Sequence, residues 1–353
     1  MNVEAREAPP PALARFESNR SVEVGLKIAD LRVADAIAFH ERFGGSFVAR
    51  DCPACGSSRK AEHGRFLERY GVSRCRGCGL LFSDPCPTKE ALAQYYAASA
   101  STAESNRLLE ARSRAGGPAA GFDRRLEVLS SFLAGREGLP TSILEIGCST
   151  GGFMERCSRE LGGRHPFAIS GIDLDPRAVE AARAKGLDAR CANAEDEVRR
   201  DARRYDLVVH FELLEHLVDP RGFMASCGGL LADGGAVYFS TPNRRGLDNA
   251  ALPFDFPRRM MAHAVFPPFH LSGFDPASVT MMLASLGFLD VDVTTPGKLD
   301  VDLIRVHESL GTVAAPFRDL TTLDERSLAV FQDVLAALGA SSHMHVFARK
   351  ERA

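Results

Sequence analysis

Four cysteines in two close pairs are the residues of this chain whose spacing points most directly to chemistry. Cys52 and Cys55 form one C-x2-C pair, and Cys75 and Cys78 form a second. A C-x2-C turn directs two thiolates toward one point, and two such turns complete the tetrahedral site of a zinc ion. Four thiolates leave no coordination position for a substrate, so the sequence predicts structural Zn²⁺, with free buried cysteines as the alternative.

A glycine turn after an apolar segment is the second feature. Residues 143–152 have the pattern of a strand, a tight turn and a helix start. In a doubly wound sheet such a turn lies at the edge where ligands bind. Gly147 and Gly151 allow close backbone approach. The dinucleotide spacing G-x-G-x-x-G is absent, because Ser149 occupies the middle position.

Two carboxylates near this turn bear on the kind of ligand. Glu145 lies inside the strand end, where its charge would repel a pyrophosphate and suit a cationic amino-acid cofactor. Asp173 ends a second apolar segment, where an acid is placed to accept two ribose hydroxyls. The alternative role of Asp173, helix capping, is better filled by Asp175 before Pro176.

An acidic and imidazole cluster follows a later apolar segment. Glu212, Glu215 and His216 have the spacing E-x-x-E-H, and residues three or four apart share one face of a helix or turn. His210 lies just before them. Because histidine is the usual general base near neutral pH, we predict catalytic roles for His216, His210 and Glu212. The alternative is that Glu215 and His216 only cap and orient the following helix.

The elements that must position these residues alternate between strand and helix from residue 140 onward. The pattern predicts strands at 142–146, 167–173, 206–210, 236–240 and 288–294, and helices at 153–161, 176–185, 220–231 and 276–286. Pro176, Pro220 and Pro276 each follow an aspartate, as at a helix start. Regular alternation implies an α/β fold with a mostly parallel sheet and helices on both faces.

The rest of the chain divides by composition. We predict five parts: a disordered leader (1–20), an N-terminal segment with a zinc ribbon (21–86), a helical linker (87–135), a cofactor-binding domain (136–295), and a C-terminal helical insertion with a closing strand (296–353). The pattern in 21–48 fits both strand and helix. The long proline-rich loop at 241–272 is predicted to be a lid, with a packed irregular segment as the alternative.

Taken in order, these motifs resemble those of class I S-adenosylmethionine-dependent methyltransferases. The resemblance covers residues 140–295 and includes 145–151, 171–173, 205–216, 231–235 and 240–243. It implies a Rossmann-like, seven-stranded sheet and S-adenosyl-L-methionine as cofactor. The implied binding residues are Glu145, Gly147, Cys148, Gly151, Asp173, Leu174, Asn193, Ala194 and His210. Ser149 and Asn193 depart from the commonest residues of the family, and the Asn193 carbonyl oxygen is still able to meet adenine.

Two narrower resemblances concern the acceptor. Residues 75–82, 95–96, 295–300 and 341–344 are similar to bacterial methyltransferases that carry a cysteine ribbon, many of them acting in sugar or secondary-metabolite pathways. The E-x-x-E-H motif is similar to that of ubiquinone-pathway and small-RNA O-methyltransferases, which bind a divalent ion there. This likeness implies a Mg²⁺ site of Glu212, Glu215, His216 and His270, with a histidine base or positioning alone as alternatives.

Composition limits the partners. The net charge is −3 and 45% of the residues are hydrophobic, without a basic footprint, a signal segment or a long apolar run. We therefore expect a cytoplasmic enzyme that methylates an oxygen of a small molecule, binds neither nucleic acid nor membrane, and is able to form a homo-oligomer. The alternatives are an N- or C-methyltransferase, a nucleic-acid methyltransferase, an NAD-dependent oxidoreductase and a catalytically inactive cofactor-binding protein.

Overall fold

The computed structural model describes residues 22–114, 120–134, 140–162, 166–200, 203–251, 264–297, 300–309, 311 and 313–351. The predicted leader and the middle of the proline-rich loop, residues 252–263, lie outside these ranges. So does the glycine–proline interruption at 116–118.

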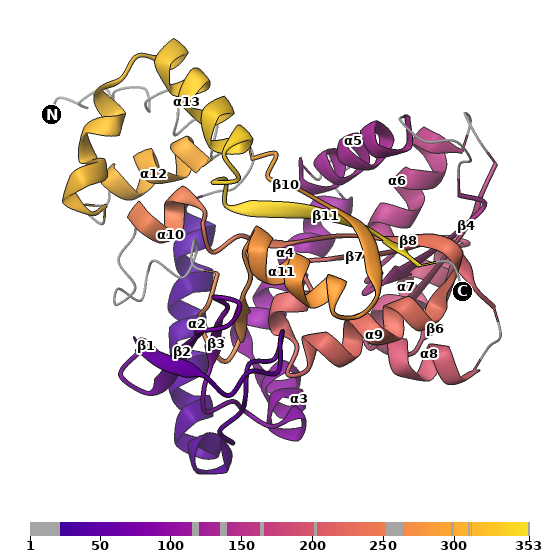
Figure 1. Ribbon diagram of the computed structural model, residues 1–353, viewed down its shortest axis with the longest axis horizontal. Helices are drawn as coiled ribbons and strands as arrows, with labels where there is room; N and C mark the ends of the chain where they lie inside the picture. The colour runs from indigo at the N-terminus through magenta and orange to yellow at the C-terminus, as the bar shows by residue number, and fades with distance from the viewer. Residues whose placement is uncertain are drawn as a thin grey trace, which may run out of the picture.

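A seven-stranded sheet forms the centre of the molecule (Figure 1). Its strands are β4 (Ser142–Ile146), β5 (Ala168–Asp173), β6 (Asp188–Cys191), β7 (Tyr205–Phe211), β8 (Leu231–Pro242), β10 (Phe288–Thr294) and β11 (His343–Lys350). Their order is β10-β11-β8-β7-β4-β5-β6, and β11 runs antiparallel to both neighbours. The predicted Rossmann-like fold and the antiparallel closing strand are therefore confirmed. β6 was not predicted, because its four residues include two charged ones.

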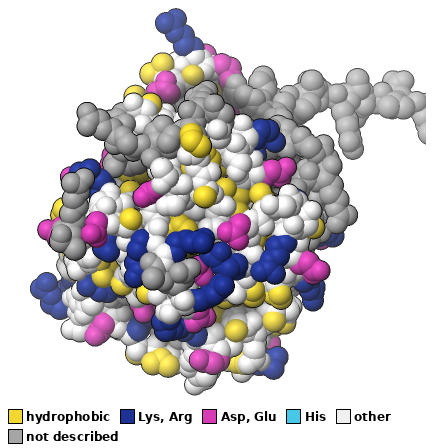
Figure 2. Space-filling model, turned by 90° about the vertical axis from the view of Figure 1, so that its right-hand side faces the viewer, with side chains coloured by type: hydrophobic (Ala, Val, Ile, Leu, Met, Phe, Trp, Pro, Cys, Tyr) yellow, Lys and Arg dark blue, Asp and Glu magenta, His cyan; other side chains and the backbone are white. Residues whose placement is uncertain are grey.

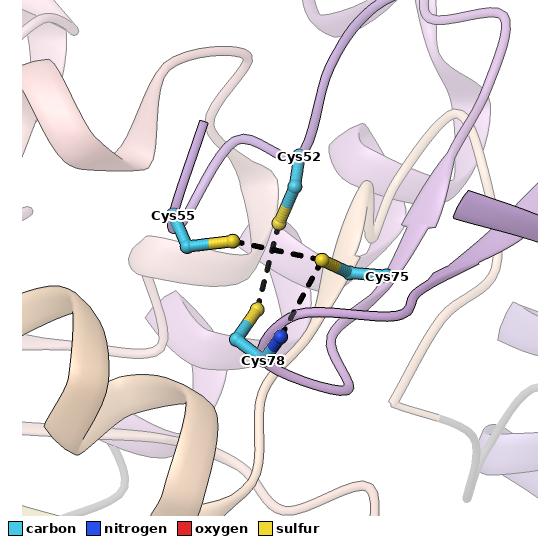
Figure 3. A group of neighbouring side chains, drawn as sticks. All are labelled: Cys52, Cys55, Cys75 and Cys78. Atoms are coloured by element: carbon cyan, nitrogen blue, oxygen red, sulfur yellow. Dashed lines mark hydrogen bonds between the residues drawn. The ribbon is translucent and has the colours of Figure 1, made fainter. Parts of the chain in front are cut away.

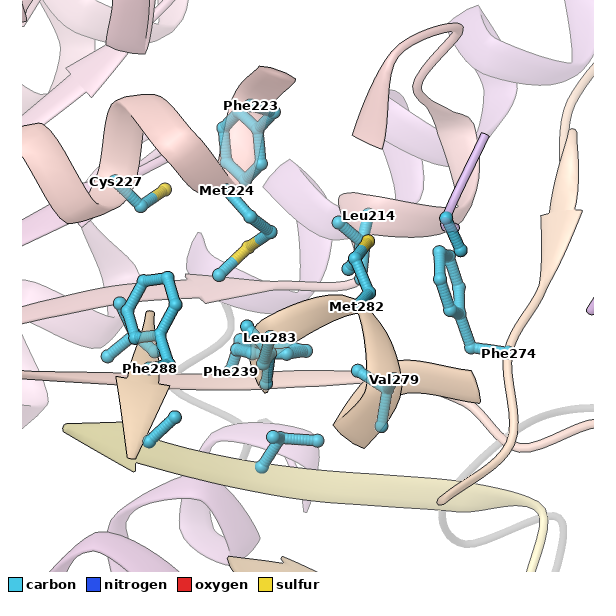
Figure 4. Packing of buried hydrophobic residues seen from close by; sticks show 14 of the residues in the cluster. Leu214, Phe223, Met224, Cys227, Phe239, Phe274, Val279, Met282, Leu283 and Phe288 are labelled. Atoms are coloured by element: carbon cyan, nitrogen blue, oxygen red, sulfur yellow. The ribbon is translucent and has the colours of Figure 1, made fainter. Parts of the chain in front are cut away.

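Six helices cover the two faces of this sheet. On one face lie α5 (Ala120–Ala134), α6 (Gly152–Leu161) and α7 (Pro176–Ala184); on the other lie α8 (Ala194–Arg200), α9 (Pro220–Leu230) and α11 (Pro276–Ala284). The three predicted aspartate caps are present: Asp175, Asp219 and Asp275 each accept a hydrogen bond from a backbone N–H in the first turn. Figure 4 shows how Phe223 and Met224 of α9 and Met282 and Leu283 of α11 pack around Phe239 of β8.

Helix α5 belongs to this layered structure, although it falls in the segment predicted as a linker. Its Leu126 and Leu129 are buried against Ile143 of β4 and Tyr238 of β8. Burial of large apolar side chains on both partners makes the contact part of the central core. The helix layer therefore begins before residue 136.

The cysteine-rich segment forms a second, four-stranded sheet. It contains β1 (Lys60–Phe66), β2 (Tyr70–Cys75), β3 (Leu81–Ser83) and β9 (Ser272–Gly273), in that order. Strand β9 comes from the proline-rich loop, and it pairs antiparallel with β3. The ribbon residues Leu80 and Phe82 are buried in the same hydrophobic cluster as Phe274 and Val279. The ribbon thus shares a core with the large sheet.

The remaining helices lie at two ends of the molecule (Figure 1). Near the ribbon are α2 (Val22–Phe43), the 3-10 turn η1 (Gly44–Ser46), α3 (Lys89–Ala98) and α4 (Ala100–Arg114). The undecided segment after residue 21 is therefore helical, and Ala36 and Phe39 pack against Tyr70. The predicted C-terminal insertion consists of α12 (Asp300–Ser309), η4 (Ala315–Thr322) and α13 (Glu325–Ala337), beside α10 (Leu247–Ala251).

One face of the surface carries both signs of charge. Figure 2 shows Lys and Arg side chains gathered near the centre of this face, with Asp and Glu side chains among them. Some arginines of the segment 190–204 are paired with acids, because Arg199 forms an ion pair with Asp196 and Arg190 with Glu197. Among the residues that the structure describes, no helix combines the length and apolar character needed to cross a membrane.

Candidate functional site

The four predicted zinc ligands converge. Their sulfur atoms all lie within 4.8 Å of one another (Figure 3). The Sγ–Sγ distances are 3.6 Å from Cys52 to Cys78 and 3.5 Å from Cys55 to Cys75. A tetrahedron with Zn–S bonds of about 2.3 Å has edges of about 3.8 Å, so the cluster fits a zinc ion.

Local backbone geometry explains why these thiols meet. The N–H of Gly56 donates to the Cys52 carbonyl and that of Gly79 to the Cys75 carbonyl, which closes two similar turns. Both glycines have positive φ, a conformation that glycine adopts without strain. The backbone N–H groups of Gly77 and Cys78 also donate to the Cys75 sulfur. At the other pair, a hydrogen bond from the Cys78 thiol lowers the pKa of the Cys52 thiol to about 5.

The predicted cofactor loop connects β4 to α6 at the carboxyl edge of the sheet. Gly147, Ser149 and Gly151 have φ values of 77°, 48° and 76°. Ser149 therefore adopts the left-handed conformation that the commoner glycine would have. A Cβ on Gly151 would lie 2.2 Å from Leu187 Cδ1 and 3.3 Å from Ala182 Cβ, so any other residue here must displace Leu187 as well as adopt a strained φ.

The two acids beside this loop differ in environment. Glu145 is 4% exposed, and one of its carboxylate oxygens has no hydrogen-bond partner. Burial raises the pKa of Glu145 to about 8. An unpartnered buried oxygen is what a cationic ammonium would satisfy. Asp173 accepts hydrogen bonds from the N–H groups of Ser149 and Asp175, which fixes its carboxylate at the end of β5.

The other predicted cofactor residues lie nearby with different roles. Leu174 is 70% exposed directly after Asp173, and offers an apolar surface for a flat ring. The Asn193 carbonyl oxygen accepts from the Asp196 N–H, so this side chain caps α8. Cys148 and Ala194 are buried. Cys148 lies in the predicted cofactor loop and Ala194 is the first residue of α8, so both pack into the protein interior.

His210 does not lie in the candidate site. Its imidazole is fully buried, stacked on Phe239 at 4.6 Å and edge-on to Phe223. Burial lowers the pKa of His210 to about 3. The alternation of β7 explains this position, because Val208 and His210 face α9 and α11 while Phe211 faces α5 and α6. The structure therefore argues against the catalytic and cofactor-binding roles predicted for His210.

Three of the four residues predicted as a divalent-ion site come together. Glu215 and His216 lie on the short turn η2 (Leu214–His216), and His270 comes from the proline-rich loop. Glu215 Oε1 is 3.8 Å from His216 Nε2 and 4.0 Å from His270 Nε2. Glu215 Oε2 accepts a hydrogen bond from Thr241, whereas Oε1 is buried without a partner.

The electrostatics of this group fit a shared cation. Burial and the nearby Glu212 raise the pKa of Glu215 to about 8. Burial lowers the pKa of His216 to about 4, and that of His270 well below its usual value. His216 Nδ1 lies 2.7 Å from the Phe269 carbonyl and donates to it, which leaves the Nε2 lone pair facing Glu215. Two neutral imidazoles and a carboxylate are therefore available as ligands.

Glu212 takes a different direction from the other members of the motif. It has a φ of 50°, and its carboxylate accepts from Ser240 and lies 3.2 Å from His343 Nε2. It is absent from the group of converging ligand atoms among the described residues. Burial would raise the pKa of Glu212, but His343 lowers it well below its usual value.

Two residues of the site were missed from sequence. Arg125 of α5 lies with its guanidinium 4.4 Å from the Phe211 ring centroid. Its charge opposes the rise that burial causes in the pKa of Glu145, and it contributes to the lowered pKa of Glu212. No local pattern singles out one arginine on an amphipathic helix. His343 lies in the segment 341–344, which was noticed only as part of a resemblance.

The turn from Glu212 to His216 lies beside the predicted cofactor loop. Leu213, between Glu212 and Glu215, has its Cδ2 atom 3.7 Å from the position that a Cβ on Gly147 would occupy. The carboxyl ends of β4 and β7 are neighbours in the sheet, which brings the two motifs together. One edge of the sheet thus carries a cofactor loop, a carboxylate–imidazole group and a second histidine–carboxylate pair.

Residues 119–293 match the family model described as a methyltransferase domain. A ubiquinone biosynthesis O-methyltransferase of Bordetella avium is 32% identical over 125 residues, which cover 34% of this chain and 48% of that protein. A protein of the same description from Thiobacillus denitrificans is 35% identical over 108 residues, covering 29% and 44%. The chain spans about half the length of these curated relatives.

Two solved structures are also similar. A SAM-dependent methyltransferase from Archaeoglobus fulgidus has a TM-score of 0.45 and 19% identity, covering 69% of this chain and 99% of that one. The plantazolicin methyltransferase BamL, in complex with a triazolic desmethylPZN analog and SAH, has a TM-score of 0.44 and 17% identity, covering 70% and 91%.

Proposed function

We propose that the chain is a class I S-adenosylmethionine-dependent methyltransferase that transfers a methyl group to a hydroxyl oxygen of a small molecule, because residues 119–293 match the methyltransferase-domain family model. The observation that carries this proposal is the cofactor loop, with Glu145 and Asp173 on either side. The names of the curated relatives favour oxygen as the methylated atom. A sugar or another polyhydroxylated metabolite is the proposed acceptor.

The chain's own residues bind and orient in this reaction. S-adenosylmethionine, when bound, supplies an electrophilic methyl group on a sulfonium. Glu145 would accept a hydrogen bond from the cofactor ammonium, and Asp173 from the ribose hydroxyls. The positive φ of Gly147 and Gly151 lets their N–H groups approach the cofactor. Catalysis then depends mainly on holding the acceptor oxygen in line with the methyl group.

A divalent ion at Glu215, His216 and His270 is a second part of the proposal. The unpartnered Glu215 oxygen and the two neutral imidazoles support it. An ion there would lower the pKa of an acceptor hydroxyl and orient it. Imidazole ligands suit Zn²⁺, Fe²⁺ or Ni²⁺ better than Mg²⁺, which prefers oxygen. EDTA should therefore lower the turnover of zinc-loaded protein, and added Fe²⁺ should restore it better than added Mg²⁺. The same turnover with EDTA, with Fe²⁺ and with Mg²⁺ would contradict an ion at this group.

We further propose that zinc in the ribbon is structural. The four thiols support this role because their spacing matches a closed tetrahedral site. The ribbon packs on α11 through Leu80 and Phe82, on the side of the sheet opposite α5 and α6. A zinc ion there would hold β3 in position to pair with β9.

The test of the proposed function is a calorimetric titration of zinc-loaded protein with S-adenosylmethionine. Wild type should bind, and Asp173→Ala should weaken binding by about 10- to 100-fold, because a hydrogen bond to a carboxylate contributes about 1.5–3 kcal/mol. Asp233→Ala, at an exposed position near the start of β8, is the matched control and should bind as wild type does. Thermal unfolding of both variants shows whether they fold. No binding to folded wild-type protein would contradict the proposal and favour a degenerate domain.

A further inference from the structure

Three sequence motifs that the cofactor site does not use meet at one point of the structure. They are Ser-Thr-Pro-Asn at 240–243, the described residues 295–297 and 300 of the motif that begins Thr-Pro-Gly, and Ser-Ser-His-Met at 341–344. The Asn243 N–H donates to the Ser342 carbonyl at 2.7 Å, and its side-chain amide donates to the Ser341 carbonyl at 2.8 Å. Asp300 accepts from the Ser342 N–H at 2.6 Å. The backbone just before His343 is therefore held from two sides.

The second and third motifs are in close contact, so that no side chain fits at Gly297. A Cβ on Gly297 would lie 2.1 Å from Asp300 Oδ2 and 2.6 Å from Ser341 Cβ. Asp300 itself is 2% exposed and accepts a second hydrogen bond from Gln332. A buried carboxylate with several donors is rigid, because each lost bond leaves an unpaired group. The result of this arrangement is one fixed starting position for β11.

That position places His343 against Glu212. The first residue of β11 pairs with Pro242 at the end of β8, and Ser240 pairs with Phe211 at the end of β7. Glu212, one residue further, adopts a φ of 50°, which is costly for a glutamate. Its two oxygens are then used by Ser240 Oγ at 2.7 Å and His343 Nε2 at 3.2 Å. Strained backbone of this kind is found where a side chain must point in one direction.

We propose that His343 accepts the proton of the acceptor hydroxyl during methyl transfer, and that Glu212 is its positioning residue. The inference rests on the proposed function. With Nε2–H directed at Glu212, the lone pair for the incoming proton is on Nδ1, where it accepts a hydrogen bond from the Ser342 hydroxyl at 3.1 Å; the acceptor hydroxyl would replace the serine as donor to this atom. The His343 side chain is 42% exposed, so an acceptor is able to reach it.

The step balances without another reactant. The acceptor oxygen forms a bond to the methyl carbon while the carbon–sulfur bond breaks, and sulfur keeps that electron pair. The hydroxyl proton passes to His343 Nδ1, and the carboxylate of Glu212 stabilises the imidazolium that results. The described groups within electrostatic range of His343 include Glu212, Glu215, Asp248, His270 and His345.

The other histidines of the site are poorer proton acceptors. His216 donates through Nδ1 to the Phe269 carbonyl, and its Nε2 faces Glu215 inside the protein. His270 is buried against Phe266 and His216. A general base must reach the proton that it removes, so accessibility favours His343.

The position of His343 can be tested without turnover. Zinc-loaded protein with ¹⁵N-labelled histidine would be saturated with S-adenosylhomocysteine, or with sinefungin, in which an amino-bearing carbon replaces the sulfonium. The sinefungin ammonium lies where the methyl would be. We expect the ring ¹⁵N shifts of His343 to differ between the two complexes, and those of His63, on β1, to stay the same. Binding of both analogues with identical His343 shifts would overturn the proposal for His343; binding of neither would overturn the proposed function instead.

Its role is tested by turnover, with catechol and a methyl glucoside as acceptors and radiolabelled methyl donor. His343→Gln should lower kcat by about 100-fold or more, with the acceptor KM and the cofactor affinity nearly unchanged. Glu212→Gln should lower kcat less, and added imidazole should partly restore His343→Ala. His63→Gln is the matched control. A kcat of His343→Gln within twofold of wild type would exclude the proton transfer.

Discussion

Gly151 shows at the scale of one residue how much the cofactor loop depends on backbone conformation. Gly151 and Gly186 have similar φ values, 76° and 81°. A Cβ added at Gly151 would collide with Leu187, whereas a Cβ added at Gly186 would meet no atom within 4 Å. Gly186→Ala should therefore cost about 1–2 kcal/mol of unfolding free energy from the left-handed conformation alone. Gly151→Ala should cost a further 1–3 kcal/mol, because Leu187 must move.

Urea unfolding of the two glycine variants measures this difference directly, since the conformational cost is common to both. S-adenosylmethionine binding should be lost only in Gly151→Ala. Equal unfolding midpoints for the two variants would show that Leu187 moves aside without a cost in free energy, and that the loop is less tightly packed than the structure indicates.

Several site residues could be predicted from the sequence because short-range pattern decides their position. Glu145 and Asp173 end predicted strands, and the ends of neighbouring parallel strands meet at one edge. His210 could not be placed correctly, since the face on which a strand residue lies depends on how the sheet is covered. Glu212 turns away from Glu215 because of its left-handed backbone, and His343 reaches it only through the pairing of β11 with β8.

At the scale of elements, strand β9 connects the ribbon to the acceptor side. The Ser83 N–H donates to the Leu271 carbonyl, and the Leu271 N–H donates to the Glu215 carbonyl, both at 2.8 Å. Leu271 directly follows His270. Removal of zinc should therefore displace two of the three proposed ion ligands, while the cofactor loop on the far side of β7 keeps its structure.

Cys55→Ser tests this coupling without a chelator, which would also remove an ion from Glu215, His216 and His270. We expect faster amide hydrogen exchange at residues 271–273 and a loss of turnover of about 10-fold or more, with a much smaller loss of cofactor affinity. Cys191→Ser, an exposed cysteine outside the ribbon, is the control. Normal turnover in zinc-free protein would show that β9 stays paired without the metal.

The elements themselves were largely predictable where the apolar pattern was regular. The predicted strands 142–146 and 288–294 coincide with β4 and β10, because apolar runs between turn residues define both ends. β6 was missed because a short strand at the sheet edge carries little apolar pattern. α2 stayed ambiguous, because its apolar residues fit both periods and only packing on Tyr70 selects the helix.

At the scale of the whole molecule, buried titratable groups predict how stability depends on pH. Burial raises the pKa of Glu145 and Glu215 to about 8 and that of Asp248 to about 7. Between pH 6.5 and 8 the unfolded chain has already lost these protons while the folded protein retains them. The free energy of unfolding should therefore fall as pH rises through this range, by about 1 kcal/mol per group and pH unit.

Buried histidines act in the opposite sense below pH 6.5. Burial lowers the pKa of His210 and His345 to about 3 and that of His216 to about 4. The unfolded chain takes up protons there that the folded protein excludes, which lowers stability as pH decreases. The buried acids offset this loss down to about pH 4.5, because the unfolded chain has already released their protons above that pH. We expect a broad maximum between about pH 4.5 and 6.5 in urea unfolding of the zinc-loaded, cofactor-free protein. Glu145→Gln should flatten the alkaline side, and a stability that rises steadily to pH 8 would contradict the assignment.

The backbone hydrogen bonds of Leu271 also limit how the ribbon and the segment 264–273 can change in evolution. Its two backbone hydrogen bonds make the segment 264–273 a structural partner of the ribbon and of the turn that carries Glu215 at once. An exchange of ribbons between relatives would carry β3 without the strand that matches it. We therefore expect segments 81–83 and 271–273 to vary together in evolution, and new acceptor preferences to arise through paired changes in two distant parts of the gene.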